Sequence, residues 1–153
     1  KISALKLINS LYMPEAVQTR FATADVVVLD LYQGSCQFMK NGAAATWLRR
    51  GDHVERIEGQ ALPVGVYQDA EPYFQKTEIY SGDYVIMISD GVLDNLPCVN
   101  KEEKLVEIIN SVRMKKPKAI ADEILKKSMG YNHEKVFDDC TVLVFGLFDT
   151  YTK

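Results

Sequence analysis

The sequence predicts one α+β domain built around an antiparallel sheet. Between residues 24 and 88, short apolar runs are separated by turn residues such as Gly34 and Asn41-Gly42, a pattern typical of strands joined in hairpins. Apolar residues at helical spacing occur before this region and again after it, and a last apolar run covers residues 141–148. Hairpin connections imply an antiparallel sheet, and we expect the helices to cover one of its faces.

Local patterns define the expected elements along the chain. The first helix is predicted from the spacing of Ile2, Leu5, Ile8 and Leu11, and Pro14 ends it. Apolar runs bounded by turns predict strands over residues 26–31, 36–40, 43–50, 53–57, 78–80 and 85–88. Pro63 cannot donate a backbone hydrogen bond, so we interpret residues 61–66 as a loop.

The second half of the chain changes to helical spacing. One helix is predicted from Leu105, Ile109 and Val112, and a second, opening near Lys118, from Ile120, Ile124 and Leu125. Residues 131–135 are expected to form a polar loop that carries His133, and both His133 and His53 are interpreted as surface residues. The run 141–148 then predicts the last strand.

The bulk composition limits the possible functions. The chain has 153 residues, of which 47% are hydrophobic, enough for one domain with a substantial core. Its net charge of -3 gives no electrostatic reason to expect nucleic acid. The three cysteines show no metal-ligand spacing and are interpreted as reduced thiols. No segment approaches the ~20 consecutive apolar residues of a membrane span.

Two acidic motifs stand at the ends of expected strands. Asp90-Gly91 follows the run 85–88, which is short, fully apolar and expected to be buried on both faces, and glycine allows a sharp turn there. Asp138-Asp139 directly precedes the last strand, which we also expect to be buried. Carboxylates at two strand ends can share a hard cation such as Mg²⁺ or Mn²⁺. The alternatives are a plain Asp-Gly turn and a solvated acidic loop.

Several segments in order resemble the PP2C-like metal-dependent protein serine/threonine phosphatases, and within them the stage II sporulation protein E type. The segments are residues 21–32, 38–44, 62–66, 89–94 and 138–142, so the similarity covers nearly the whole chain. The resemblance implies an antiparallel β-sandwich flanked by helices, with a two-metal site at one edge. In that family, metal-activated water attacks the phosphorus atom of a phosphoserine directly.

The resemblance also assigns roles to individual residues. Asp90 and Asp138 match the metal-bound aspartates on which catalysis depends, and Asp139 takes a place often held by Asn. Gly91 matches a glycine whose backbone lies close to the metal site, and Asp94 matches an acid of a looser, additional metal site. The cofactor is therefore expected to be Mn²⁺ or Mg²⁺.

The family pattern also contains an early Asp and an Asp-Gly pair that would precede Lys1. Residues 1–153 are accordingly expected to form a single partial domain that lacks its first strands and half of its metal ligands. Such a piece should hydrolyse little or nothing alone. Its unpaired sheet edge should favour a homo-oligomer.

For the intact protein, the resemblance implies dephosphorylation of a phosphoserine protein of the anti-sigma-factor antagonist type, with release of a sigma factor in sporulation. The expected location is cytoplasmic, on the inner face of the membrane if the parent protein is anchored there. The alternative is a binding module that recognises a phosphoprotein without hydrolysing it. A nucleotide-binding domain is disfavoured because the sequence has no glycine-rich phosphate loop. Arg49 and Arg50 either steer a phosphoprotein or form a strand-end charge pair.

Overall fold

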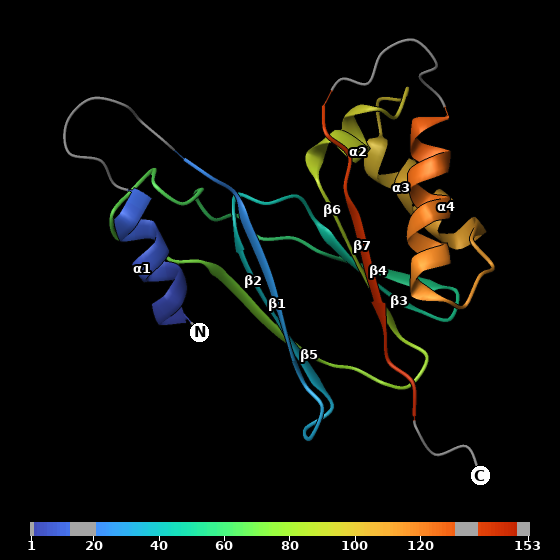
Figure 1. Ribbon diagram of the computed structural model, residues 1–153, viewed down its shortest axis with the longest axis horizontal. Coiled ribbons are helices and arrows are strands. Elements are labelled where there is room, and N and C mark those ends of the chain that lie inside the picture. The colour runs from blue at the N-terminus through green and yellow to red at the C-terminus, as the bar shows by residue number, and fades with distance from the viewer. Residues whose placement is uncertain (1, 13–20, 131–137, 150–153) are drawn as a thin grey trace. The chain divides into compact units, whose positions relative to one another are not determined.

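A computed structural model describes residues 2–12, 21–130 and 138–149 (Figure 1). These residues fall into two compact units. The first unit comprises Lys1–Ala43 with Glu58–Ile79, and the second comprises Ala44–Ile57 with Tyr80–Lys153. Each unit contains its own antiparallel sheet and at least one helix, so the α+β class predicted from the sequence is confirmed. That residues 1–153 form a single partial domain stays a prediction.

The first unit contains helix α1 and a three-stranded sheet. Its elements are α1 (Ile2–Tyr12), β1 (Ala24–Asp30), β2 (Ser35–Asn41) and β5 (Tyr73–Glu78). The strand order is β1-β2-β5, and both pairings are antiparallel. Gly34 has a φ of 59° in the β1–β2 turn, a left-handed conformation that glycine adopts without steric cost.

Asn9 connects α1 to the loop that follows Pro63. Its Nδ2 atom donates to the carbonyl oxygens of Tyr67 and Gln68, at 2.9 Å in each case. Its Oδ1 atom accepts from the backbone N–H of Gly65 at 2.7 Å. Because Asn9 is buried, these three bonds satisfy its own amide group, which water does not reach. The loop predicted over residues 61–66 is therefore confirmed, and its backbone is held by a helical side chain.

The second unit holds a four-stranded sheet and three helices. Its strands are β3 (Thr46–Arg50), β4 (His53–Ile57), β6 (Tyr84–Ile88) and β7 (Val142–Gly146), in the order β4-β3-β6-β7. All pairings are antiparallel. The helices are α2 (Asp90–Asp94), α3 (Lys101–Ser111) and α4 (Pro117–Met129). Helix α3 is capped by Asn100, whose side chain accepts from the N–H of Glu103, and α4 opens with a proline at its first turn.

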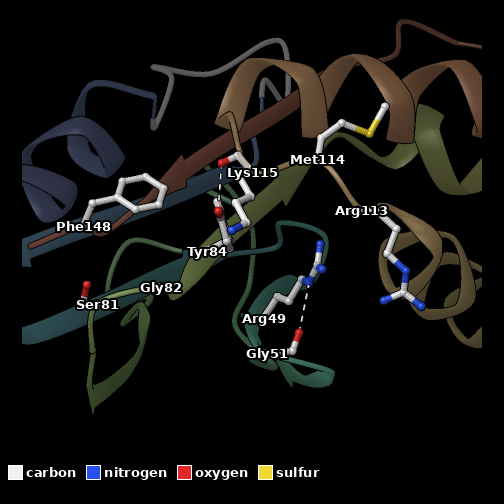
Figure 2. A pocket seen from close by; sticks show the side chains of 9 residues that line it. All are labelled: Arg49, Gly51, Ser81, Gly82, Tyr84, Arg113, Met114, Lys115 and Phe148. Atoms are coloured by element: carbon white, nitrogen blue, oxygen red, sulfur yellow. Dashed lines mark hydrogen bonds between the residues drawn. The ribbon is translucent and has the colours of Figure 1, made fainter.

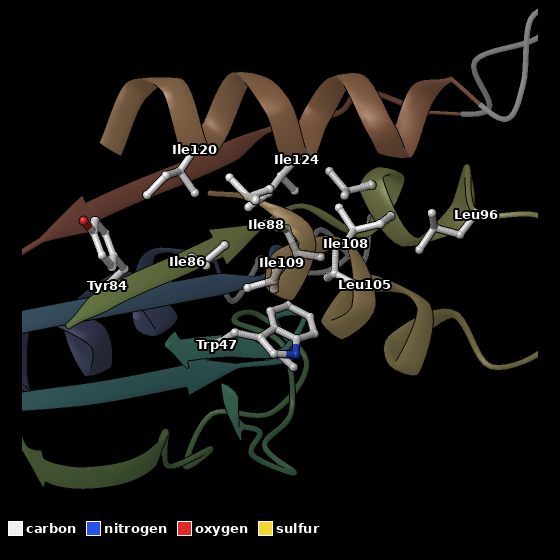
Figure 3. Close-up of a cluster of buried hydrophobic side chains, with 13 residues drawn as sticks. Trp47, Tyr84, Ile86, Ile88, Leu96, Leu105, Ile108, Ile109, Ile120 and Ile124 are labelled. Atoms are coloured by element: carbon white, nitrogen blue, oxygen red, sulfur yellow. The ribbon is translucent and has the colours of Figure 1, made fainter. Parts of the chain in front are cut away.

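The core of this second unit lies between its sheet and helices α3 and α4 (Figure 3). Trp47 and Ile86 contribute from neighbouring strands, and Leu105, Ile109 and Ile120 contribute from the helices; all five are fully buried. The helical residues recur every three or four positions, which places them on one face of each helix. This packing fixes β6, and with it the point at which the chain leaves the sheet towards Asp90.

The structure corrects four expectations. The strand predicted at 78–80 runs over Tyr73–Glu78, the strand predicted at 43–50 begins only at Thr46, and α2 was not expected at all. The last strand was expected to be buried, but β7 lies at the end of the strand order and Leu143 is 55% exposed. The strand at 85–88 is confirmed as buried. The predicted loop at 131–135, with His133, lies outside the described residues.

The cysteines are reduced, as predicted. Cys36, Cys98 and Cys140 are all free, and Cys36 is fully buried in β2. Burial raises the pKa of the Cys36 thiol to about 12, so this side chain stays protonated and inert at neutral pH. Within the described ranges, none of the helices combines the length and apolarity that crossing a membrane requires.

Candidate metal centre

Asp90 stands at the junction between β6 and α2. Ser89, which precedes it, is still extended, with φ -80° and ψ 159°, and Asp90 then begins the short helix. The Asp90 side chain is exposed, and its Oδ1 atom accepts a hydrogen bond from the N–H of Gly91 at 3.0 Å. The buried strand thus delivers one solvated carboxylate at its carboxyl end, as the sequence predicted.

Ser89 fastens this junction to the segment before β7. Its Oγ atom donates to the carbonyl oxygen of Asp139 at 3.0 Å and accepts from the N–H of Thr141 at 2.9 Å. Its backbone N–H donates to the carbonyl oxygen of Thr141 at 3.0 Å. These bonds extend the β6–β7 pairing past Ile88 and bring the two acidic motifs together.

Gly91 allows a close backbone approach. A β-carbon at this position would lie 2.5 Å from the carbonyl oxygen of Asp139 and 3.2 Å from the carbonyl carbon of Asp138. The sequence predicted that glycine allows a sharp turn here; the chain does turn from β6 into α2, but Gly91 is helical and is not among the positive-φ glycines. The requirement is steric: only hydrogen fits between α2 and the Asp138-Asp139 backbone.

Asn95 supports the same junction from inside the protein. Its buried Nδ2 atom donates to the carbonyl oxygen of Gly91 at 2.7 Å and to the Cys140 sulfur at 3.1 Å. Burial raises the pKa of the Cys140 thiol, so the sulfur remains a neutral acceptor. Sequence reasoning missed both Ser89 and Asn95 as supports. In the sequence, Ser89 is only a serine before Asp-Gly, and Asn95 is only a polar residue after a short segment. Neither pattern is specific enough to predict a supporting role.

Asp138 and Asp139 are exposed beside this junction. The Oδ1 atom of Asp138 accepts from the N–H of Asp139 at 2.8 Å. In the part of the chain that the structure describes, neither Asp138 nor Asp90 has a cationic partner. Two exposed, uncompensated carboxylates at adjacent backbone segments fit a hard divalent cation, which prefers oxygen donors. Over residues 2–12, 21–130 and 138–149, however, no three His, Cys, Asp or Glu side chains are grouped closely enough to hold a metal.

Asp94 differs from the other acids in its charge environment. It ends α2, and its carboxylate pairs with the Lys101 ammonium at 2.7 Å. Asp94 and Asp90 line the same surface cavity of about 300 Å³, which Asn100 and Lys101 also line. A cation at Asp94 would compete with Lys101, so we expect this acid to be a weaker ligand than Asp90.

The Ser89 hydroxyl should contribute measurably to stability. We expect Ser89→Ala to lower the free energy of unfolding by about 1–2 kcal/mol, because two backbone groups lose their partner. Urea denaturation checks this, with Ser10→Ala as the matched control, since the exposed Ser10 hydroxyl makes only a local bond to the carbonyl of Leu7. Equal effects of the two substitutions would contradict this account of the junction.

An Asp-Gly pair packed against an Asp-Asp pair, at the end of a helix-covered antiparallel sheet, is the arrangement that the resemblance to the PP2C-like phosphatase class led us to expect. The profile of the Stage II sporulation protein E (SpoIIE) family matches residues 2–148. The chain belongs to that family.

Two relatives and one solved structure show how far the similarity extends. The chain is 30% identical to stage II sporulation protein E of Priestia megaterium and 28% identical to that of Bacillus subtilis (strain 168), each over 142 residues. These matches cover 92% of the chain but only 24% and 17% of the relatives. The phosphatase domain of SpoIIE from Bacillus subtilis, in an Mn-presoaked structure, superposes with a TM-score of 0.80 at 24% identity. That superposition covers 99% of this chain and 68% of the other.

Proposed function

We propose that this protein removes phosphate from a phosphoserine protein of the anti-sigma-factor antagonist type and thereby releases a sigma factor in sporulation. Membership of the SpoIIE family supports the reaction class. The observation that carries the metal-dependent chemistry is the contact between Gly91 and the Asp138-Asp139 backbone, because it keeps the exposed carboxylates of Asp90 and Asp138 on adjacent segments at the carboxyl end of β6.

The reaction requires a divalent cation, Mn²⁺ or Mg²⁺, which when bound supplies Lewis acidity and lowers the pKa of a bound water. Asp90 and Asp138 are the residues that would hold it, and the exposed Asp139 is placed to assist. The backbone of Gly91 keeps the two acidic segments adjacent. Asp94 would take part in a weaker, additional site because Lys101 already neutralises it. The Mn-presoaked structure of the SpoIIE phosphatase domain supports this cation class.

Asp90, Asp138 and Asp139 supply only part of the ligand set that a divalent cation needs. The family resemblance also implies an early Asp and a further Asp-Gly pair, and residues 1–153 contain no Asp-Gly pair besides Asp90-Gly91. We propose that a form of the protein with those motifs is the active one, that residues 1–153 alone turn over little, and that the protein acts in the cytoplasm. Self-association through an unpaired sheet edge belongs to the same proposal.

The test is phosphate release from a phosphoserine protein by the longest natural form of the protein, with Mn²⁺ or with EDTA. Release that requires Mn²⁺ is the expected result. Binding of the phosphoprotein without any release, by a folded protein in Mn²⁺, would contradict the enzyme and favour a non-catalytic binding module. Equal release in EDTA would contradict the metal requirement.

A further inference from the structure

A second pocket lies at the opposite end of β6 from Asp90. It has a volume of about 440 Å³, within the range of small-molecule sites, and it lies wholly inside the second unit (Figure 2). The residues that line it are Arg49, Gly51, Ser81, Gly82, Tyr84, Arg113, Met114, Lys115 and Phe148. Tyr84 and Ser89 are separated by five residue steps along an extended segment. At about 3.3 Å per step, the pocket lies roughly 16 Å from the candidate metal centre.

The charge of this pocket is positive. Arg49, Arg113 and Lys115 line it, and among the described lining residues none is acidic. Asp52 lies 3.5 Å from Arg113, but both side chains are largely exposed, so the pair is weak and an incoming anion can compete with it. Lys115 is exposed and has no acidic partner among the described residues.

Arg49 is the lining cation with an unsatisfied donor. Its Nε atom donates to the carbonyl oxygen of Gly51 at 3.2 Å, whereas its Nη1 atom is buried and lacks a hydrogen-bond partner in the described structure. A buried guanidinium N–H without an acceptor is unfavourable, and an oxyanion would satisfy it. The neighbouring Arg50 differs, because it pairs with the buried carboxylate of Asp83 at 2.7 Å. The strand-end charge pair therefore explains Arg50 and leaves Arg49 available to a ligand.

An aromatic wall stands beside these cations. The Tyr84 hydroxyl donates to the carbonyl oxygen of Lys115 at 2.8 Å, and its ring meets that of Phe148 edge to face at 5.7 Å. The Arg49 guanidinium lies 5.9 Å from the centre of the Tyr84 ring, within cation–π range. Both the ring and the guanidinium are thus held in place before a ligand arrives, which reduces the entropy cost of binding.

We propose that this pocket binds a small organic anion, with an aromatic ring against Tyr84 and Phe148 and a phosphate or carboxylate head on Arg49 and Lys115. The proposal is independent of phosphatase activity. Phenyl phosphate and benzoate are suitable probes, titrated in EDTA so that the metal centre cannot hold them. The readout is the shift of backbone amide resonances of the protein.

Saturable shifts at Gly51, Gly82 and Lys115 with either probe are the expected result, and the relative affinity of the two identifies the head group. Arg49→Gln should weaken binding about tenfold or more, because a charge-assisted pair is lost. Lys126→Gln, the same charge change on the exposed face of α4, should have no effect. Lys115→Gln, at an exposed position, should weaken binding as well, and it serves if Arg49→Gln does not fold.

Three results would overturn the proposal. The first is the absence of saturable shifts at these amides, or their occurrence only around Asp90. The second is equal binding by the Arg49→Gln, Lys115→Gln and Lys126→Gln proteins. The third is inorganic phosphate binding as tightly as phenyl phosphate, which would exclude a role for the aromatic wall.

Discussion

Asp90→Asn is expected to lower Mn²⁺-dependent phosphate release by about a hundredfold or more, since several kcal/mol of transition-state stabilisation depend on the cation that Asp90 would hold. The substitution keeps the shape of the side chain and retains an oxygen that can accept from the N–H of Gly91. Because Asp90 is exposed and makes only that local bond, the fold should be unaffected. Initial rates on a phosphoserine protein, measured in the longest natural form, check this prediction.

The matched control for that experiment is Asp122→Asn. Asp122 is also an exposed helical aspartate, its carboxylate pairs with Lys118 one turn away in α4, and it belongs to neither acidic motif. The Asp122→Asn substitution should leave the rate of Mn²⁺-dependent phosphate release unchanged. Comparable losses in the two variants, or full activity of Asp90→Asn, would show that Asp90 is an ordinary turn residue.

Gly91→Ala is expected to damage both stability and metal binding. The new methyl group would meet backbone, not a flexible side chain, at 2.5 Å from the carbonyl oxygen of Asp139. Either α2 or the Asp138-Asp139 segment must shift, at a cost of about 1–3 kcal/mol in unfolding free energy. The same shift separates the two acidic segments, so Mn²⁺ affinity should fall as well. Urea denaturation and Mn²⁺ titration calorimetry measure the two effects.

Gly130→Ala provides the comparison. Gly130 follows α4 with a φ of -64°, and an added β-carbon would lie 3.1 Å from the carbonyl oxygen of Lys126. An alanine fits this conformation, so we expect a change below about 1 kcal/mol of either sign. If Gly91→Ala proved as mild as Gly130→Ala, the close approach at Gly91 would not constrain the site.

The accuracy of the sequence predictions depended on how local each signal was. The strand at 85–88 was predicted within one residue. An uninterrupted apolar run indicates burial on both faces of a strand, even when the neighbouring strands are not known. Strand β5 was misplaced because the half-buried Gln75 and Thr77 are polar while the exposed Phe74 is apolar, so the sequence shows no apolar alternation. Helix α2 has only five residues, too few for a helical period to be visible.

The candidate site was predictable in its acids and not in its supports. Asp90 and Asp138 stand beside recognisable apolar runs, and the family resemblance assigned them. The bonds from Ser89 to Asp139 and Thr141 join residues 50 and 52 positions apart, and they exist only because β6 pairs with β7. The steric role of Gly91 has the same origin. Sequence alone could name a glycine there, but the reason for it needed the neighbouring strand.

The central claim is that Asp90 and Asp138 hold one shared cation. A double-mutant cycle on Mn²⁺ affinity, measured by calorimetry in the longest natural form with Asp90→Asn, Asp138→Asn and the two combined, tests it most directly. We predict that each single substitution weakens binding about tenfold or more, and that the double variant is weaker by much less than the product of the two effects. Unchanged affinity in either single variant, or strictly independent losses, would contradict a shared metal centre.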